Sequence, residues 1–90
     1  MDIDQLYQIY LQHPEICTDS RKIVHGCLFF ALKGDAFDGN QFAVSALHTG
    51  ASYAIVDDIT LASVERCIIV DDVLSCLQKL ASFHRKQLNI

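Results

Sequence analysis

Three short apolar runs restrict the fold of this chain more than any other feature of its sequence. They cover residues 27–32, 52–56 and 67–70, and each has the length of a strand and falls far short of a bilayer span. Near-continuous apolar character, clearest in the first run, is typical of a strand that is covered on both faces. The runs therefore predict a small buried sheet.

Amphipathic patterns predict three helices beside these strands. Residues 2–12 place their apolar side chains on one helical face, and Asp2 is positioned as the N-cap. Residues 40–49 follow the same pattern, with Asn40 as the expected cap and Phe42 on the apolar face. A third helix of about four turns is expected after the second pair of aspartates.

The order of these elements indicates the fold class. A further short strand is expected at residues 16–18, whereas residues 59–66 fit either a loop or a single helical turn. Alternating strands and helices of this kind are typical of α/β proteins. We expect a small mixed sheet flanked by helices, in one domain that covers residues 1–90.

Composition excludes several classes of protein. Seven basic against eleven acidic side chains give a net charge of -4, which argues against a nucleic-acid partner. The acidic N-terminus has no signal-peptide character, and no run is long enough for membrane insertion. The four cysteines form no close pair, so we expect reduced thiols without metal, in a cytoplasmic protein.

The first candidate binding segment is a polar turn directly after the short strand at residues 16–18. Hydroxyl groups can bond to a base edge or a ribose, and Arg or Lys can neutralise a phosphate. The alternative is a solvated turn in which an aspartate caps its own backbone. The turn consists of Thr18, Asp19, Ser20, Arg21 and Lys22.

The second candidate is the loop Lys33 to Gly39, which also directly follows a strand. Its glycines allow backbone N–H groups to approach a ligand, and Phe37 offers a flat face to a base. The loop is not a nucleotide-binding P-loop, because no GxxxxGK[ST] motif is present. If the preceding strands are parallel, both segments leave the same edge of the sheet and form one cleft.

Two pairs of aspartates, at residues 57–58 and 71–72, are the third candidate. Acids at strand ends occur in metal sites and in phospho-accepting receiver domains, but a receiver also needs a lysine after a later strand. No lysine lies between Lys33 and Lys79, so loop turning and helix capping are the favoured roles. His84 on a helical face is expected to pack or to compensate the helix dipole. We expect no catalytic residue in this chain.

Taken together, the segments carry a family resemblance. Thr18-Asp-Ser-Arg-Lys, Gly26-Cys-Leu-Phe-Phe-Ala-Leu-Lys-Gly and Phe37-Asp-Gly, followed by Phe42-Ala and Gly50-Ala, resemble the N-terminal domain of Mur ligases. The similarity is strong over residues 16–58 and looser afterwards. Any one of these pieces alone would be unspecific, whereas the combination at these intervals is specific.

The resemblance implies a domain that binds the UDP part of a UDP-N-acetylmuramoyl-peptide (UDP-MurNAc-peptide). The chain most resembles the Mur ligases that add D-alanyl-D-alanine to the tripeptide. The alternatives are the sister ligase that adds the third amino acid and a stand-alone nucleotide-binding module. In the family, later domains bind ATP with Mg²⁺ and the incoming amino acid or dipeptide. The phosphate loop that binds ATP in the family is absent from this chain. We therefore expect a downstream ATP-binding domain as partner, and no cofactor or ligase activity in this chain alone.

The resemblance also assigns residues by position. Thr18 and Ser20 match the family's contacts near the uracil and the ribose. The second uridine-contacting stretch corresponds to Asp35, Ala36 and Phe37. Arg21 and Lys33 are secondary candidates that would orient the substrate or contact a phosphate.

Overall fold

The computed structural model describes residues 2–34 and 38–88 and contains a parallel sheet of four strands. All three strand pairs are parallel, and the strands lie side by side in chain order. The predicted α/β class is confirmed. Antiparallel pairing within the described residues is limited to the isolated bridge between Lys33 and Asp38. The strands are β1 (Ile16–Cys17), β2 (Leu28–Phe30), β3 (Tyr53–Val56) and β4 (Cys67–Ile69).

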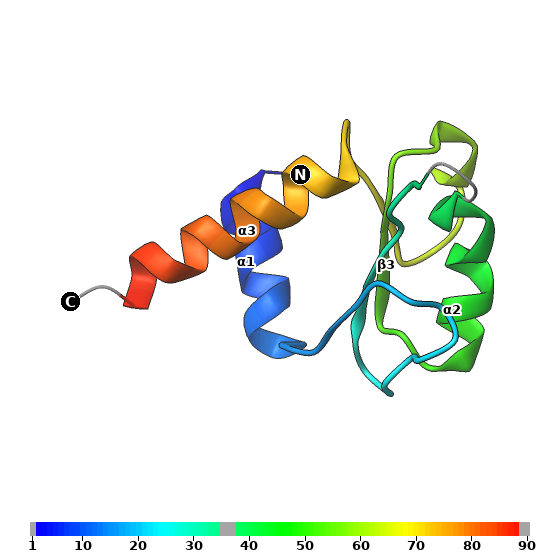
Figure 1. Ribbon diagram of the computed structural model, residues 1–90, viewed down its shortest axis with the longest axis horizontal. Coiled ribbons are helices and arrows are strands. Elements are labelled where there is room, and N and C mark those ends of the chain that lie inside the picture. The colour runs from blue at the N-terminus through cyan, green and yellow to red at the C-terminus, as the bar shows by residue number, and fades with distance from the viewer. Residues whose placement is uncertain (1, 35–37, 89–90) are drawn as a thin grey trace.

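Helices cover both faces of this sheet (Figure 1). The helices α1 (Ile3–Gln12) and α3 (Val73–Leu88) pack together on one face, and α2 (Ala43–Thr49) covers the other. The C-terminal half of α3 projects away from the sheet, as Figure 1 shows. No helix in the described part of the chain is long and apolar enough to cross a membrane.

The strand β2 shows why its sequence is apolar throughout. Leu28 and Phe30 pack against α1 and α3, whereas Phe29 points to the face covered by α2. All three side chains are at most 1% exposed. Because successive side chains of a strand point to opposite faces, a strand between two layers of helices needs apolar residues at every position.

The first helix begins as the sequence predicts. The Asp2 carboxylate accepts a hydrogen bond from the Gln5 N–H at 2.9 Å, and the Gln5 side chain accepts one from the Asp2 N–H at 3.0 Å. This reciprocal pair is a capping box, which satisfies N–H groups that the first helical turn leaves without partners. Asp2 is therefore the N-cap of α1.

The second helix differs from its prediction. Residues 40–49 are divided into a 3-10 turn, η1 (Gly39–Phe42), and the shorter helix α2. Asp38 is the cap, because its carboxylate accepts from the Asn40 N–H at 2.9 Å. The prediction of Asn40 as the cap is wrong; its side chain is buried and makes long-range contacts instead. Residues 59–61 form a second 3-10 turn, η2 (Ile59–Leu61).

Candidate functional site

The parallel sheet brings the two predicted binding segments together at the C-terminal ends of β1 and β2. A cleft of about 450 Å³ lies there, between the turn that follows β1 and the 3-10 turn η1. We call it the edge cleft, and it is lined by Thr18, Asp19, Ser20, Arg21, Phe29, Gly39 and Phe42. Three of the predicted site residues, Thr18, Ser20 and Arg21, therefore line one cleft. Asp35, Ala36 and Phe37 lie outside the described residues.

Asp19 and Arg21, which both line the edge cleft, form an ion pair. The Arg21 side chain donates to both oxygens of Asp19, through Nε and Nη2, each at 3.0 Å. The Arg21 backbone N–H also donates to Asp19 Oδ1 at 2.9 Å, so the carboxylate caps the turn as well. These bonds lower the pKa of Asp19 from 3.8 to about 2, and the side-chain bond to Arg21 contributes most. The same pairing raises the pKa of Arg21.

The polar groups of the cleft are accessible to a ligand. The Arg21 side chain is 86% exposed, so its guanidinium can turn from Asp19 to an anion at small cost. Within residues 2–34 and 38–88, the hydroxyls of Thr18 and Ser20 have no hydrogen-bond partner. Each hydroxyl can both donate and accept a hydrogen bond.

Phe42 and Phe29 supply the apolar part of the cleft. Phe29 is 1% exposed and belongs to the buried sheet, whereas Phe42 is 40% exposed and lies on the wall formed by η1. The prediction that Phe42 lies on the buried face of the helix is wrong, because the 3-10 turn changes the angular spacing of side chains. Ala43 and Ala46, assigned to the same face, are buried. No pattern in the sequence marked Phe42 as a cleft residue.

Lys33 lies outside the edge cleft, although it follows β2. Its Nζ is 3.3 Å from Oδ1 of Asp57, at the end of β3. This contact raises the pKa of Lys33, first through the hydrogen bond to Asp57 and then through the charge of Asp57. In the described structure, Lys33 therefore pairs with Asp57, the residue after β3, and does not line the cleft.

Two of the four paired aspartates, Asp58 and Asp72, have the capping role that the sequence predicts. Asp58 accepts from the Thr60 N–H at 2.9 Å and caps η2, and Asp72 accepts from the Ser75 N–H at 2.8 Å at the start of α3. In the described part of the chain, no group of three or more His, Cys, Asp or Glu side chains could hold a metal ion. His84 packs against the rings of Tyr7 and Tyr10, and its Nδ1 forms a hydrogen bond with the Tyr7 hydroxyl at 3.0 Å.

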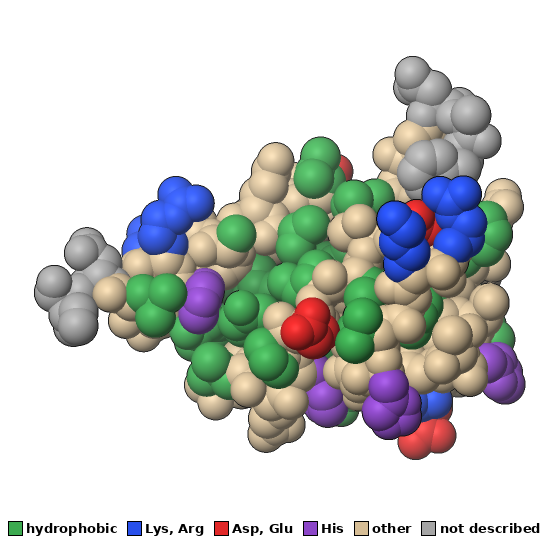
Figure 2. Space-filling view, turned by 60° about the horizontal axis from the view of Figure 1, so that its bottom comes forward, with side chains coloured by type: hydrophobic (Ala, Val, Ile, Leu, Met, Phe, Trp, Pro, Cys, Tyr) green, Lys and Arg blue, Asp and Glu red, His purple; other side chains and the backbone are tan. Residues whose placement is uncertain are grey.

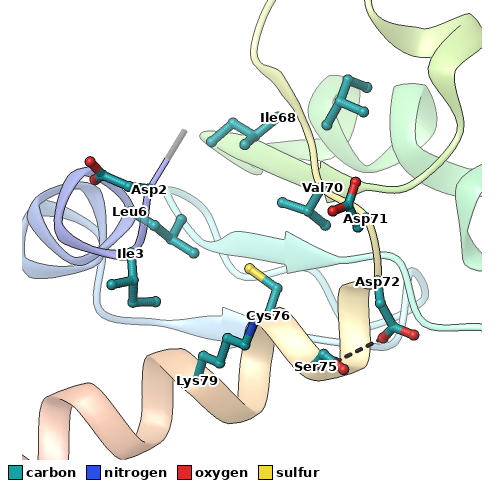
Figure 3. A pocket seen from close by; sticks show the side chains of 11 residues that line it. Asp2, Ile3, Leu6, Ile68, Val70, Asp71, Asp72, Ser75, Cys76 and Lys79 are labelled. Atoms are coloured by element: carbon teal, nitrogen blue, oxygen red, sulfur yellow. Dashed lines mark hydrogen bonds between the residues drawn. The ribbon is translucent and has the colours of Figure 1, made fainter.

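A larger hollow of about 670 Å³ lies between α1, β4 and α3 (Figure 3). Its floor is apolar, with Leu6 and Val70 among the lining side chains, and its rim carries Asp2, Asp72 and Lys79. Of the three carboxylates that line the hollow, Asp2 and Asp72 are engaged as helix caps, and Figure 3 shows Asp72 bonded to Ser75. None of the four predicted site residues that the structure describes lines this hollow. The edge cleft, in contrast, is lined by three of the predicted site residues.

Charge on the surface is distributed in small groups. On the face drawn in Figure 2, the basic side chains gather at separate places, with apolar and neutral surface between them. A continuous basic stripe, which would indicate nucleic-acid binding, is not seen on that face. An anionic ligand would therefore be held by local groups such as Arg21.

ATP and Mg²⁺, which the family resemblance implies for whole ligases, do not fit the residues of this chain. ATP-binding ligases of this kind hold the phosphates with a glycine-rich loop that carries a lysine. No GxxxxGK[ST] motif occurs in the 90 residues.

A parallel α/β domain with a polar cleft at the C-terminal edge of its sheet is a class of fold that commonly binds nucleotides. A known protein family of this class matches most of the chain. The family model described as "Mur ligase family, catalytic domain" matches residues 14–85. The chain belongs to the Mur ligase family.

Curated relatives include two kinds of ligase. The chain is 38% identical over 78 residues to the UDP-N-acetylmuramoyl-tripeptide--D-alanyl-D-alanine ligase of Synechocystis sp., covering 83% of this chain and 17% of the relative. It is 40% identical over 75 residues to the Escherichia coli ligase of the same name, covering 80% and 16%. A UDP-N-acetylmuramoyl-L-alanyl-D-glutamate--2,6-diaminopimelate ligase of Haemophilus influenzae is 58% identical over 45 residues, covering 50% and 9%. The chain thus spans 9–17% of the length of these relatives.

Solved structures of MurF ligases superimpose on most of this chain. The MurF ligase from Thermotoga maritima, in complex with ADP, superimposes with a TM-score of 0.68 at 33% identity, over 74% of this chain and 16% of that one. A MurF structure from Acinetobacter baumannii superimposes with a TM-score of 0.69 at 31% identity, over 83% and 16%. The small α/β domain of this chain therefore corresponds to a part of MurF.

Proposed function

We propose that this chain binds the uridine diphosphate part of a UDP-MurNAc-peptide, as the substrate-binding domain of a ligase that adds D-alanyl-D-alanine to the tripeptide. The observation that carries the proposal is the edge cleft, where two hydroxyls, a cation and an exposed aromatic ring meet. The similarity to MurF supports the identity of the substrate.

The groups of the cleft match the chemistry of a uridine nucleotide. Uracil presents donors and acceptors on its edge, which the hydroxyls of Thr18 and Ser20 can pair with. The flat face of the base can stack on Phe42, a contact that is worth about 1–3 kcal/mol for an aromatic side chain. Arg21 can leave Asp19 and pair with a phosphate, whose geometry suits a guanidinium.

The segment at residues 35–37 is proposed as a second uridine-contacting stretch. Asp35, Ala36 and Phe37 correspond to that stretch only through the family resemblance. Lys33 and Asp38, which flank residues 34–37 in the sequence, form an isolated bridge. Lys33 is assigned here to the polar contact with Asp57 rather than to a phosphate.

In the whole ligase, this domain would act at a distance from the reaction. Binding energy from the nucleotide would hold the substrate so that its peptide carboxylate lies near ATP. ATP and Mg²⁺ would bind to a downstream domain in the cytoplasm, where the acyl phosphate would form and react with the amine of D-alanyl-D-alanine. This chain alone would bind nucleotide and perform no ligation.

A second candidate is the ligase that adds diaminopimelate as the third amino acid. The 58% identity over 45 residues to the Haemophilus influenzae enzyme favours it. Assays of the gene's full protein would separate the two candidates. Phosphate release with UDP-MurNAc-tripeptide and D-alanyl-D-alanine supports the first, and release with UDP-MurNAc-dipeptide and diaminopimelate supports the second.

Variants of the edge cleft test the binding proposal. Ser20→Ala removes one hydrogen bond and is expected to weaken UDP binding by about 0.5–1.5 kcal/mol. Phe42→Leu removes the stacking face and is expected to cost about 1–3 kcal/mol. Ser82→Ala on exposed α3 is the matched control and should bind UDP like the unmodified chain. Equal affinities for all four proteins by calorimetry would contradict the proposed site.

A further inference from the structure

The wall of the edge cleft contains a buried amide. Asn40 lies in η1, between the cleft residues Gly39 and Phe42, and its side chain faces away from solvent. It is 6% exposed and is the one buried polar residue among residues 2–34 and 38–88. A buried polar side chain needs hydrogen-bond partners, so its contacts indicate what it does for the fold.

Every polar atom of this amide has a partner. Asn40 Nδ2 donates to Oδ1 of Asp38 and to Oδ1 of Asp57, each at 2.7 Å. Asn40 Oδ1 accepts from the backbone N–H of Asp57 at 3.1 Å. Two carboxylates require a donor and the N–H requires an acceptor, so these partners define the orientation of the amide.

The contacts join η1 to the end of β3. Asp57 directly follows β3 and lies 17 positions after Asn40 in the sequence. The Lys33 ammonium also lies 3.3 Å from Oδ1 of Asp57. The same oxygen of Asp57 therefore contacts both Lys33, which follows β2, and Asn40, which lies in η1. Hydrogen bonds to charged groups are stronger than those between neutral groups.

A second anchor attaches the same wall to the end of β2. The Gly39 N–H donates to the Leu32 carbonyl at 2.8 Å. The backbones are so close that a Cβ on Gly39 would lie 2.6 Å from the Leu32 oxygen. The wall is therefore attached at Gly39 to the chain after β2 and at Asn40 to the chain after β3.

We propose that Asn40 is a positioning residue, which holds Gly39 and Phe42 opposite Thr18 and Ser20 and so sets the width of the edge cleft. Asn40 itself does not line the cleft, and it acts through its bonds to Asp38 and Asp57. The ligand part of this inference rests on the proposed function. The position of the wall can be measured without any ligand.

Asn40→Asp tests the inference with almost no change in shape. It keeps the acceptor for the Asp57 N–H, loses both N–H donors and adds a third carboxylate beside Asp38 and Asp57. We expect the amide NMR signals of Gly39 to Phe42 to shift in the unliganded chain. We expect UDP affinity to fall about tenfold or more, the effect of losing one hydrogen bond to a charged group.

A second substitution distinguishes positioning from general destabilisation. Asn40→Asp combined with Asp57→Asn restores an amide–carboxylate pair in the reverse direction. UDP affinity should recover at least about fivefold from the single variant, as expected for regaining about 1 kcal/mol. Asp58→Ala is the matched control: it removes the cap of η2 next to Asp57 and should lower thermal stability while leaving UDP affinity unchanged. Asn40→Ser adds no charge and replaces Asn40→Asp should that variant fail to fold.

The outcomes separate the inference from the proposed function. If the unmodified chain binds UDP and Asn40→Asp binds it equally well, the positioning role is overturned. If the unmodified chain shows no UDP binding, the proposed function and the ligand role of Asn40 fail together. In that case, signals of residues 39–42 that stay unchanged in Asn40→Asp also overturn the role in the wall, whereas shifts confined to them and reversed by the double variant support it.

Discussion

The lowered pKa of Asp19 is the main electrostatic feature of the edge cleft. This pKa is about 2 instead of 3.8, because Arg21 donates side-chain and backbone hydrogen bonds to the ionised form. A lowered pKa means that the contribution of this group to stability is present above pH 3.8. It is lost as the pH falls through about 2.

An NMR titration of the Asp19 carboxyl carbon checks this assignment. The midpoint is expected near 2 in the unmodified chain, and Arg21→Ala should move it toward 3.8, because the side-chain bonds are then absent. Arg85→Ala on α3 removes an equal charge far along the sequence and should leave the midpoint unchanged. A midpoint near 3.8 in the unmodified chain would show that the ion pair does not form in solution.

Gly39 is required by the close approach of two backbone segments. Gly39→Ala would place its Cβ 2.6 Å from the Leu32 carbonyl oxygen, so η1 must move. We expect a loss of about 1–3 kcal/mol of stability, typical of overpacking, measured by urea unfolding. Ser82→Ala, on an exposed part of α3, should unfold like the parent. Equal midpoints for Gly39→Ala and the parent would contradict the packing of η1 described above.

At the scale of elements, α1 and α3 are joined by an aromatic cluster with one hydrogen bond. The Tyr7 ring lies 4.9 Å from the Phe83 ring, and its hydroxyl is 3.0 Å from His84 Nδ1. Tyr7→Phe keeps the ring contacts and removes the hydrogen bond. The free energy of unfolding should fall by about 0.5–1.5 kcal/mol. Tyr10→Phe, whose hydroxyl is outside this bond, should change it less; the reverse order would refute the pairing.

Most elements of the fold could be predicted from local patterns. The apolar runs gave the buried strands, and the helical spacing with Asp2 gave α1, because burial on both faces and helix capping leave direct marks in the sequence. The division of residues 39–49 could not be predicted, since Asp38 and Asn40 are both good caps. Their roles are decided by the contact of Asn40 with Asp57, which lies far along the chain.

The residues that line the edge cleft could be predicted in part, again from local patterns in the sequence. Polar turns after strands identified Thr18, Ser20 and Arg21, because parallel strands deliver such turns to one edge. Lys33 follows the same rule in sequence, yet its ammonium pairs with Asp57 instead of lining the cleft. Phe42 was placed in the core by helical spacing and is exposed because η1 is a 3-10 turn. Such side-chain choices depend on tertiary contacts that no local pattern records.

At the scale of the whole molecule, the parallel order of the strands places the edge cleft at one end of the sheet. The fold contains no P-loop sequence, and the proposed role of the domain is to bind substrate. We therefore expect no ATP turnover by the purified 90-residue chain. Phosphate release above that of a heat-treated control would contradict this expectation.

Titration of UDP into the isotopically labelled chain, followed by amide NMR shifts, tests the central claim most directly. Sulfate and UMP serve as comparison ligands, because sulfate offers only an anion and UMP lacks the second phosphate. We predict the largest UDP shifts at Thr18 to Arg21 and at Gly39 to Phe42, with a related pattern for UMP and a different one for sulfate. Largest shifts in the hollow between α1, β4 and α3, or the same pattern with sulfate, would contradict a uridine site in the edge cleft.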